Sequence, residues 1–105
     1  MKKLLPALLL ATTILTSFDN SVSNQQKTVT GKIVGASNEG VTDAYVYVVA
    51  GEEETLSLKD GKFSLKTWQP LPLVLVIEHN DFEKQQIVIR ASDKPVTIKL
   101  LERKN

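Results

Sequence analysis

The chain has no cysteine and contains one histidine and one tryptophan in 105 residues. Without cysteine it cannot form disulfides, and it has no thiolate ligand for a metal and no thiol for lipid attachment. The lone histidine, His79, cannot complete a zinc site without several carboxylates from elsewhere in the chain. No glycine-rich phosphate loop, nucleophile elbow or Ser-His-Asp arrangement is evident. The sequence therefore predicts no enzyme, no metal site and no cofactor.

A surplus of charge of one sign is also lacking. Thirteen basic and 12 acidic side chains give a net charge of +1. Removal of residues 1–23 takes away Lys2, Lys3 and Asp19, which leaves a net charge of zero. Nothing in this balance favours nucleic acid, an anionic membrane or another polyanion as a partner.

Long apolar runs are absent except at the N-terminus. There, two lysines precede an apolar stretch over residues 4–18, and small polar residues follow it. This three-part pattern predicts a signal peptide over residues 1–23, with cleavage near Ser23 and Asn24 or, alternatively, near Ser17. The stretch is shorter than the roughly 20 apolar residues that span a bilayer, so we expect no stable membrane anchor.

The rest of the chain is expected to form one exported domain. Residues 24–27 are a short polar lead-in, and residues 28–105 have the length of a single domain. We expect the mature protein in the bacterial periplasm, on the cell surface or outside the cell. The absence of cysteine means that this domain must fold without disulfides.

Alternation of apolar and polar residues with a period of two dominates the domain, and no apolar pattern at helical spacing reaches three turns. The segments between the alternating stretches are rich in Gly, Pro, Asn and Asp, which favour turns. This spacing predicts an all-β fold, a seven-stranded sandwich of two sheets with Greek-key connections. The expected strands cover residues 28–35, 44–50, 55–59, 62–66, 73–78, 82–90 and 95–101.

Asp60 and Gly61 lie at the centre of the segment TLSLKDGKFSLKT. An Asp-Gly pair between alternating residues predicts a two-residue hairpin loop of type I′, in which both residues have positive φ. Asp60 is thereby a turn residue and not a catalytic or metal-binding group. The loop would place four apolar side chains on one face, namely Leu56, Leu58, Phe63 and Leu65.

The same alternation predicts the hydrophobic core of the sandwich. Burial of this set would stabilise a domain of about 80 residues enough to fold independently. The expected inward residues are Val29, Ile33, Val46, Val48, Leu56, Leu58, Phe63, Leu65, Leu73, Leu75, Ile77, Ile87, Ile89, Val96, Ile98 and Leu100.

Four short motifs follow one another in a recognisable order: TGKIV with Gly31, EGVTDAYVYV, DGKFSL and VTIKL. In this order and spacing they resemble the carboxypeptidase-regulatory-like domain, which has a transthyretin-like β-sandwich. The resemblance implies a non-catalytic domain, here a stand-alone secreted form like the domains found in Bacteroidota. The sequence departs from the family at Asp43 and at Asp81, where glycine is usual.

Three other groups of polar residues favour solvated loops over sites. His79 lies in EHND, a cluster that could hold a metal, although a turn between strands is the better interpretation. Glu52 to Glu54 could form one side of a calcium site, but no second group of carboxylates accompanies them. Lys32 alternates outward, away from the core position that an isopeptide bond to the last strand would need.

Two classes of function remain. The first is a secreted interaction module that binds another protein or a second copy of itself. The resemblance implies that residues 44–50 and 73–78 are neighbouring strands, and their outward residues are unusually apolar for a solvated face. The predicted interaction face consists of Tyr45, Tyr47, Val49, Val74, Val76 and Val88. The alternative is a small module that binds polysaccharide by stacking on Tyr45, Tyr47 and Trp68.

Overall fold

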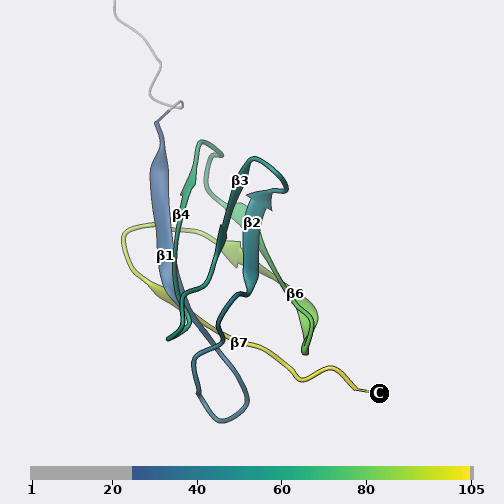
Figure 1. The fold of residues 1–105 in the computed structure, drawn as a ribbon. Helices are drawn as coiled ribbons and strands as arrows, with labels where there is room; N and C mark the ends of the chain where they lie inside the picture. Colours follow the sequence, from purple (N-terminus) through teal and green to yellow (C-terminus); the bar gives the residue numbers. More distant parts are fainter. Residues whose placement is uncertain (1–24, 105) are drawn as a thin grey trace, which may run out of the picture.

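Two β-sheets packed face to face make up the domain in the computed structural model, which describes residues 25–104 (Figure 1). The predicted all-β, seven-stranded sandwich is confirmed. The predicted signal peptide lies outside the described residues. Within residues 25–104 there is no helix long and apolar enough to cross a membrane. The strands are β1 (Lys27–Val34), β2 (Tyr45–Val49), β3 (Glu53–Leu56), β4 (Lys62–Thr67), β5 (Leu73–His79), β6 (Phe82–Ile89) and β7 (Val96–Lys99).

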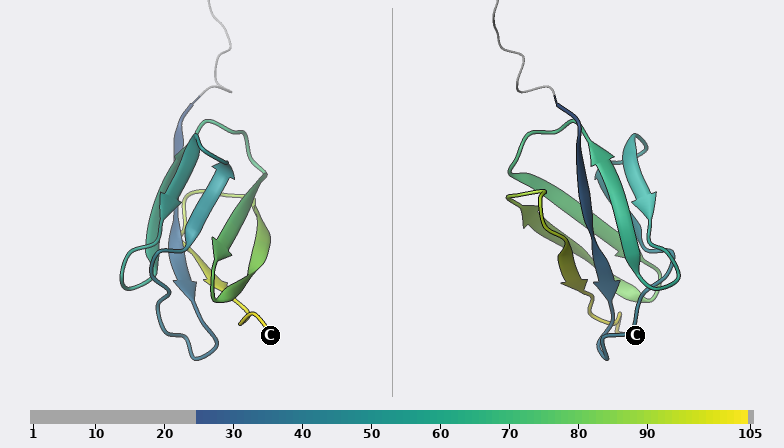
Figure 2. Two further views of the ribbon diagram at one scale, coloured as in Figure 1. Left: turned by 45° about the vertical axis from the view of Figure 1, so that its right-hand side comes forward. Right: turned by 90° about the vertical axis from the view of Figure 1, so that its left-hand side faces the viewer.

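The seven strands divide into a three-stranded and a four-stranded sheet. Sheet A has the order β4-β1-β7, and sheet B has the order β3-β2-β5-β6. In sheet A, β1 runs antiparallel to β4 and parallel to β7, and it lies between them in the right-hand view of Figure 2. In sheet B, β5 lies between β2 and β6, as the resemblance implied.

The segment between β3 and β4 differs from the prediction. The two strands belong to different sheets, so they do not form a hairpin. The turn between them has three loop residues, because the Gly61 N–H donates to the Leu58 carbonyl at 2.8 Å and the Leu58 N–H donates to the Lys62 carbonyl at 2.8 Å. Gly61 has a φ of 90°, whereas Asp60 does not have positive φ. The predicted type I′ loop is therefore wrong, although Asp60 does lie in a turn.

This crossing also explains two errors in the predicted core. Leu56 and Leu58 precede the crossing, and their side chains are 55% and 65% exposed, whereas Phe63 and Leu65 follow it and are buried. The alternation thus shifts face where the chain changes sheets. Gly61 is required at this point, since a Cβ there would lie 2.3 Å from the Ile33 carbonyl oxygen.

Ser57 fixes the place where the chain leaves sheet B. Its side chain is buried, and its hydroxyl donates to the Val41 carbonyl at 2.6 Å while accepting from the Ala44 N–H at 2.9 Å. Its N–H donates to the Ala44 carbonyl, and its carbonyl accepts from the Asp43 N–H. Because buried polar groups are costly when unpaired, these four bonds hold residues 41–44 against the end of β3.

The core between the sheets otherwise agrees with the prediction. Val48, Ile87 and Val96 are half-buried and pack against it, and residues outside the predicted set, Val41, Ala44 and Phe82, also join it. The core residues are Val29, Ile33, Val41, Ala44, Val46, Phe63, Leu65, Leu73, Leu75, Ile77, Phe82, Ile89, Ile98 and Leu100.

Gly31 lets the three strands of sheet A approach one another. It pairs with Phe63 on β4 and with Val96 on β7. A Cβ at this position would lie 2.3 Å from the Val96 carbonyl oxygen and 2.8 Å from the Phe63 ring. The aromatic ring therefore occupies the space that a side chain at residue 31 would need.

Asp43 has a φ of 61°, in the left-handed region that glycine adopts most easily. This is one of the two positions at which the sequence departs from the glycine of the family it resembles. Asp is among the residues that tolerate this conformation, so the backbone keeps its course despite the different side chain.

Candidate functional site

The register of sheet B brings five of the six residues of the predicted interaction face together. Tyr45 pairs with Glu78 and Tyr47 with Val76 between β2 and β5, and Val74 pairs with Val88 between β5 and β6. Directly paired residues of neighbouring strands share a face. We call the side of sheet B that carries these residues, opposite the core, the outer face of sheet B.

Val49 is not placed on this face by the register. β2 pairs Tyr47 with Glu54 but Val49 with Glu53, so a bulge separates the two pairs. A bulge inserts a residue and interrupts the alternation of side chains. Val49 is half-buried at the end of β2.

Exposure varies across the outer face of sheet B. Val74 and Val88 are 48% and 52% exposed, whereas Val76 is 8% exposed. Val76 lies between Tyr47 and Gln86 on the neighbouring strands, and we attribute its low exposure to these longer side chains. Leu56, which pairs with Tyr45, adds another exposed apolar side chain on β3. Sequence reasoning missed Leu56 because it placed this residue in the core.

The two tyrosines of β2 are fixed by carboxylates on both sides. Their ring centroids are 4.8 Å apart. The Tyr47 hydroxyl donates to Glu78 Oε2 at 2.7 Å, and the Tyr45 hydroxyl donates to Glu54. These hydrogen bonds are the main cause that raises the pKa of both phenols above the ordinary value. Both tyrosines therefore stay neutral hydrogen-bond donors at physiological pH.

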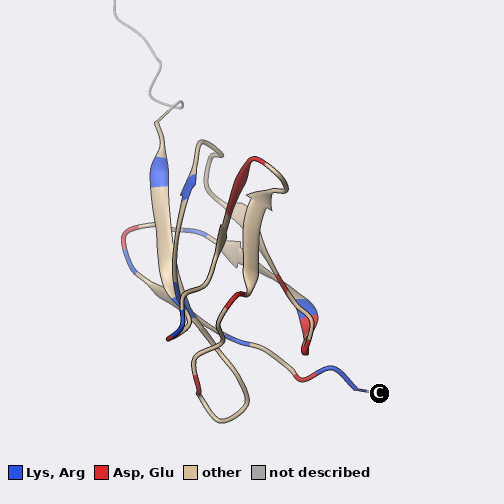
Figure 3. Cartoon of the chain, in the orientation of Figure 1, with Lys and Arg blue, Asp and Glu red and all other residues tan. Residues whose placement is uncertain are grey.

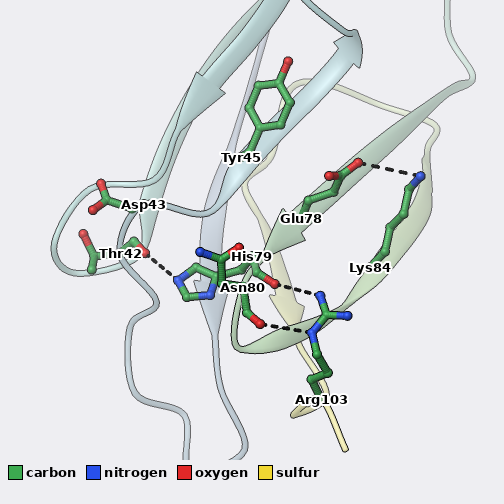
Figure 4. Close-up of a pocket in the computed structure, with 8 residues that line it drawn as sticks. All are labelled: Thr42, Asp43, Tyr45, Glu78, His79, Asn80, Lys84 and Arg103. Carbon is green, nitrogen blue, oxygen red and sulfur yellow. Dashed lines mark hydrogen bonds and ion pairs between the residues drawn. The ribbon is translucent and has the colours of Figure 1, made fainter. Parts of the chain in front are cut away.

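A shallow cavity of about 670 Å³ adjoins one end of the outer face of sheet B (Figure 4). Glu78, which belongs to both, forms an ion pair with Lys84 at 3.7 Å. The cavity is lined by Thr42, Asp43, Tyr45, Glu78, His79, Asn80, Lys84 and Arg103.

His79 has both ring nitrogens engaged with the backbone. Nδ1 accepts a hydrogen bond from the Asp81 N–H at 3.0 Å, and Nε2 lies 3.1 Å from the Thr42 carbonyl oxygen. This pairing fits a neutral ring that carries its proton on Nε2. Across residues 25–104, no three His, Asp or Glu side chains converge as a metal site would require. His79 is the last residue of β5 and not part of the turn as predicted, although its ring is bonded to the turn that follows.

Arg103 attaches the C-terminal segment to the turn between β5 and β6. Its guanidinium donates to the carbonyls of His79, Asn80 and Phe82 at 2.9 to 3.3 Å. Its backbone N–H also donates to the Asp81 carbonyl. Sequence reasoning missed this contact, because a single Arg in a short polar tail carries no pattern that predicts its partner.

Trp68 lies in a different place from the two tyrosines. It is 54% exposed and lines a hollow of about 520 Å³ together with Glu52, Glu53, Glu54 and Lys66, among others. Tyr45 and Tyr47 do not line this hollow, so the three rings of the glycan hypothesis are not gathered in one concavity.

The side chain of Glu53, on β3 of sheet B, bonds to the end of β4 in sheet A beside Trp68. Its carboxylate accepts from the Thr67 hydroxyl at 2.6 Å and from the Trp68 N–H at 3.0 Å. The first of these bonds is the main cause that lowers the pKa of Glu53 below its ordinary value. Glu53 is therefore committed to joining β3 to the end of β4, and it orients the backbone of Trp68.

Apart from Val34, which is buried at the end of β1, the outer face of sheet A is polar. Its cross-strand pairs are Thr30 with Ser64, Lys32 with Lys62 and Lys32 with Thr97. Figure 3 shows lysines along β1 and β4, and the acidic run at the start of β3. The two sides of the sandwich therefore differ in chemistry.

Comparisons with known proteins support the fold. No family model matches the chain, and no curated protein matches it. Among solved structures, it is similar to a chain of a type II cohesin–X-dockerin complex from Acetivibrio cellulolyticus, an N-terminal interface mutant, with a TM-score of 0.60 and 16% identity. The match covers 72% of this chain and 58% of that chain.

A second match is to a 9R-lipoxygenase from Cyanothece PCC8801, with 12% identity and a TM-score of 0.38. It covers 85% of this chain and 18% of that chain, and it carries no argument at this score. The cohesin–X-dockerin match is consistent with the two-sheet architecture described above. At 16% identity it shows a β-sandwich fold and nothing more specific.

Proposed function

We propose that this chain is a non-enzymatic interaction module that binds another protein through the outer face of sheet B. One observation carries the proposal: Tyr47, Val74, Val76 and Val88 lie together on the side of the sheet that does not face the core. An antiparallel sheet with one solvated face ordinarily shows polar residues there. A contiguous apolar patch usually marks a site of interaction.

The two tyrosines of β2 suit such binding. The two tyrosines present large, flat surfaces whose hydroxyls are already bonded to Glu54 and Glu78, so little side-chain freedom is lost when a partner covers them. Aromatic side chains of this kind are enriched in interfaces. The lone histidine, whose ring nitrogens are occupied by backbone groups, supports a binding role over a catalytic one.

We also propose that the module is a secreted relative of the carboxypeptidase-regulatory-like domains. The motifs that carry this resemblance coincide with structural requirements: Gly31 allows close strand approach, and Asp43 occupies a position of positive φ. Export rests on the signal-peptide pattern of residues 1–23. Intact-mass measurement of protein recovered from the periplasm or the medium tests it, and a mass that retains Met1 to Phe18 would contradict it.

The binding face is tested by the double change Tyr47→Ser with Val76→Thr. In a pull-down from the cells that produce the protein, the double variant should no longer retain the partner. Its thermal unfolding transition should remain cooperative. A matched control, Thr30→Ser with Thr97→Ser, changes the outer face of sheet A and should leave retention as in the unchanged protein. Equal retention by all three proteins would refute the proposed face.

A second candidate function is glycan binding at Trp68 alone. It is favoured by the exposed indole in a hollow that also offers carboxylates and Lys66, since aromatic faces and polar groups together suit sugar rings. Trp68 is the sole tryptophan, so its fluorescence reports directly on this hollow. Titration with a panel of polysaccharides should quench or shift the emission, and a flat response across the panel would remove this candidate.

A further inference from the structure

We propose that the partner of the outer face of sheet B is a second copy of the same chain, packed face to face about a two-fold axis that runs along the strands between β2 and β5. This inference rests on the proposed function and names its partner. It follows from how the side chains of the face are distributed over the four strands, and not from their apolar character alone.

The side chains of the face form two complete levels across the sheet. One level contains Tyr47 and its cross-strand partners Val76 and Glu54, with Gln86 beyond Val76. The next contains Tyr45 and its partners Leu56 and Glu78, with Lys84 ion-paired to Glu78. Acidic Glu54 thus lies on the β3 edge, and basic Lys84 lies on the opposite β6 edge.

A two-fold axis along the strands exchanges the two edges of the sheet. It places β2 of one copy over β5 of the other, and β3 over β6. Tyr47 then faces Val76 of the second copy. Glu54 faces Gln86 and lies one level away from Lys84, which faces Leu56, so the acidic edge of each copy adjoins the basic edge of the other. Aligned packing of two sheets at about 10 Å is a common arrangement and lets the side chains of both faces interdigitate.

The other two-fold axis in the plane of the face, across the strands, is disfavoured by the same residues. With the axis at the Tyr47 level, it places each strand over its own copy, so Glu54 approaches Glu54 of the second copy and the exposed Val74 approaches the Glu78 level. Like charges brought together in an interface oppose association. The distribution of charge therefore favours the axis along the strands over this packing.

The size of the face indicates a weak dimer. Four strands spaced about 4.8 Å apart give a width of about 19 Å. The 7 residues of β5 at about 3.3 Å each give a length of about 23 Å, so the total buried area is roughly 900 Å², below the range of most specific interfaces. Sedimentation equilibrium from about 10 µM to about 1 mM of the mature domain therefore covers the range in which the dimer should form.

A charge exchange tests the arrangement. In Lys84→Glu the two facing edges are both acidic, and in Glu54→Lys they are both basic, so each variant alone should dimerise at least about tenfold more weakly than the unchanged domain. An equimolar mixture of the two variants should restore dimers, because each acidic edge then meets a basic edge. Lys99→Glu, on the outer face of sheet A, serves as the control and should dimerise normally.

Three results would overturn the proposal: a monomer for the unchanged domain up to about 1 mM, two variants that dimerise normally, or a mixture that stays monomeric. A monomer that still captures a partner through Tyr47 and Val76 would leave the proposed function standing and replace the second copy with a different protein. A monomer whose partner capture ignores those residues would remove both proposals. Circular dichroism of each variant verifies that the sandwich is folded.

Discussion

The outer faces of the two sheets share one β architecture but differ in chemistry at their central positions. On sheet A, Thr30 pairs with Ser64 and Lys32 pairs with Lys62, so the outward residues in the middle of β1 and β4 are polar. On sheet B, the corresponding central positions are tyrosine and valine. Threonine favours strands as well as valine does. Sheet A therefore shows that a sheet of this domain forms with a polar outer face. Strand formation alone does not require the outward valines of sheet B.

The largest effect on stability is expected from a change that disrupts the strand packing of sheet A. Gly31→Ala places a Cβ against the Val96 carbonyl oxygen and the Phe63 ring, so β1 cannot stay between its neighbours. We expect a loss of about 3 kcal/mol or more in the free energy of unfolding, measured by urea denaturation.

The matched control for this change is Gly51→Ala. At Gly51 a Cβ would meet nothing within 4 Å, but φ is +82°. The free energy of unfolding should then fall by only about 1 kcal/mol, because alanine is strained at this φ. Equal losses at the two positions would contradict the argument that close packing requires Gly31.

Separating the two sheets at their crossing should have the next largest effect. Ser57→Ala leaves the Ala44 N–H and the Val41 carbonyl without their side-chain partner in a buried place. We expect the free energy of unfolding to fall by about 1 to 3 kcal/mol. Ser64→Ala, at an exposed position on sheet A, should change it by less than about 0.5 kcal/mol.

Making the face of sheet B resemble that of sheet A should change association and not folding. In the double change Val74→Lys with Val88→Lys, both side chains are about half exposed, so the free energy of unfolding should change by less than about 1 kcal/mol. Binding through the face should be lost in sedimentation or retention measurements. Unchanged binding would mean that the exposed valines serve only the strand conformation.

The smallest effect concerns the link between the sheets beside Trp68. The pKa of Glu53 is lowered in the folded state, chiefly by the Thr67 hydroxyl, so its ionised form contributes stability above its unfolded pKa, about 4.3. That contribution is lost as pH falls through the lowered folded pKa.

Glu53→Gln should therefore be less stable than the unchanged domain at pH 7, by a few tenths of a kcal/mol for this partly exposed group. The difference should shrink as the pH is lowered below about 4. Denaturation at a series of pH values measures it. Glu52→Gln, a change at an exposed neighbour, is the control and should change the free energy of unfolding at pH 7 by less than about 0.5 kcal/mol.

The strands and most of the core could be predicted from the sequence, because a period of two is a local property that each strand carries by itself. The assignment of strands to sheets could not. Leu56 and Phe63 belong to one alternating segment, yet a change of sheet between them turns Leu56 outward and Phe63 inward. That crossing depends on the buried bonds of Ser57, a residue whose type alone indicates nothing about burial.

The candidate site shows the same division. The outward positions of β5 and β6 followed from alternation, whereas Val49 did not, since a bulge in β2 has no signature in a run of valines. The contacts of Arg103 join segments that are far apart in the sequence. Pairing between distant polar groups is set by the tertiary fold and cannot be predicted from spacing.

The central position of β1 in sheet A has a consequence for the order of assembly. Its neighbours are β4 and β7, and the pair Gly31 and Val96 joins segments near opposite ends of the domain. Contacts between such distant segments require a long loop to close before they give any stabilisation, which slows folding to about the millisecond-to-second range typical of β-sandwiches. Until residues 96–99 arrive, one edge of β1 stays open to pairing with other chains.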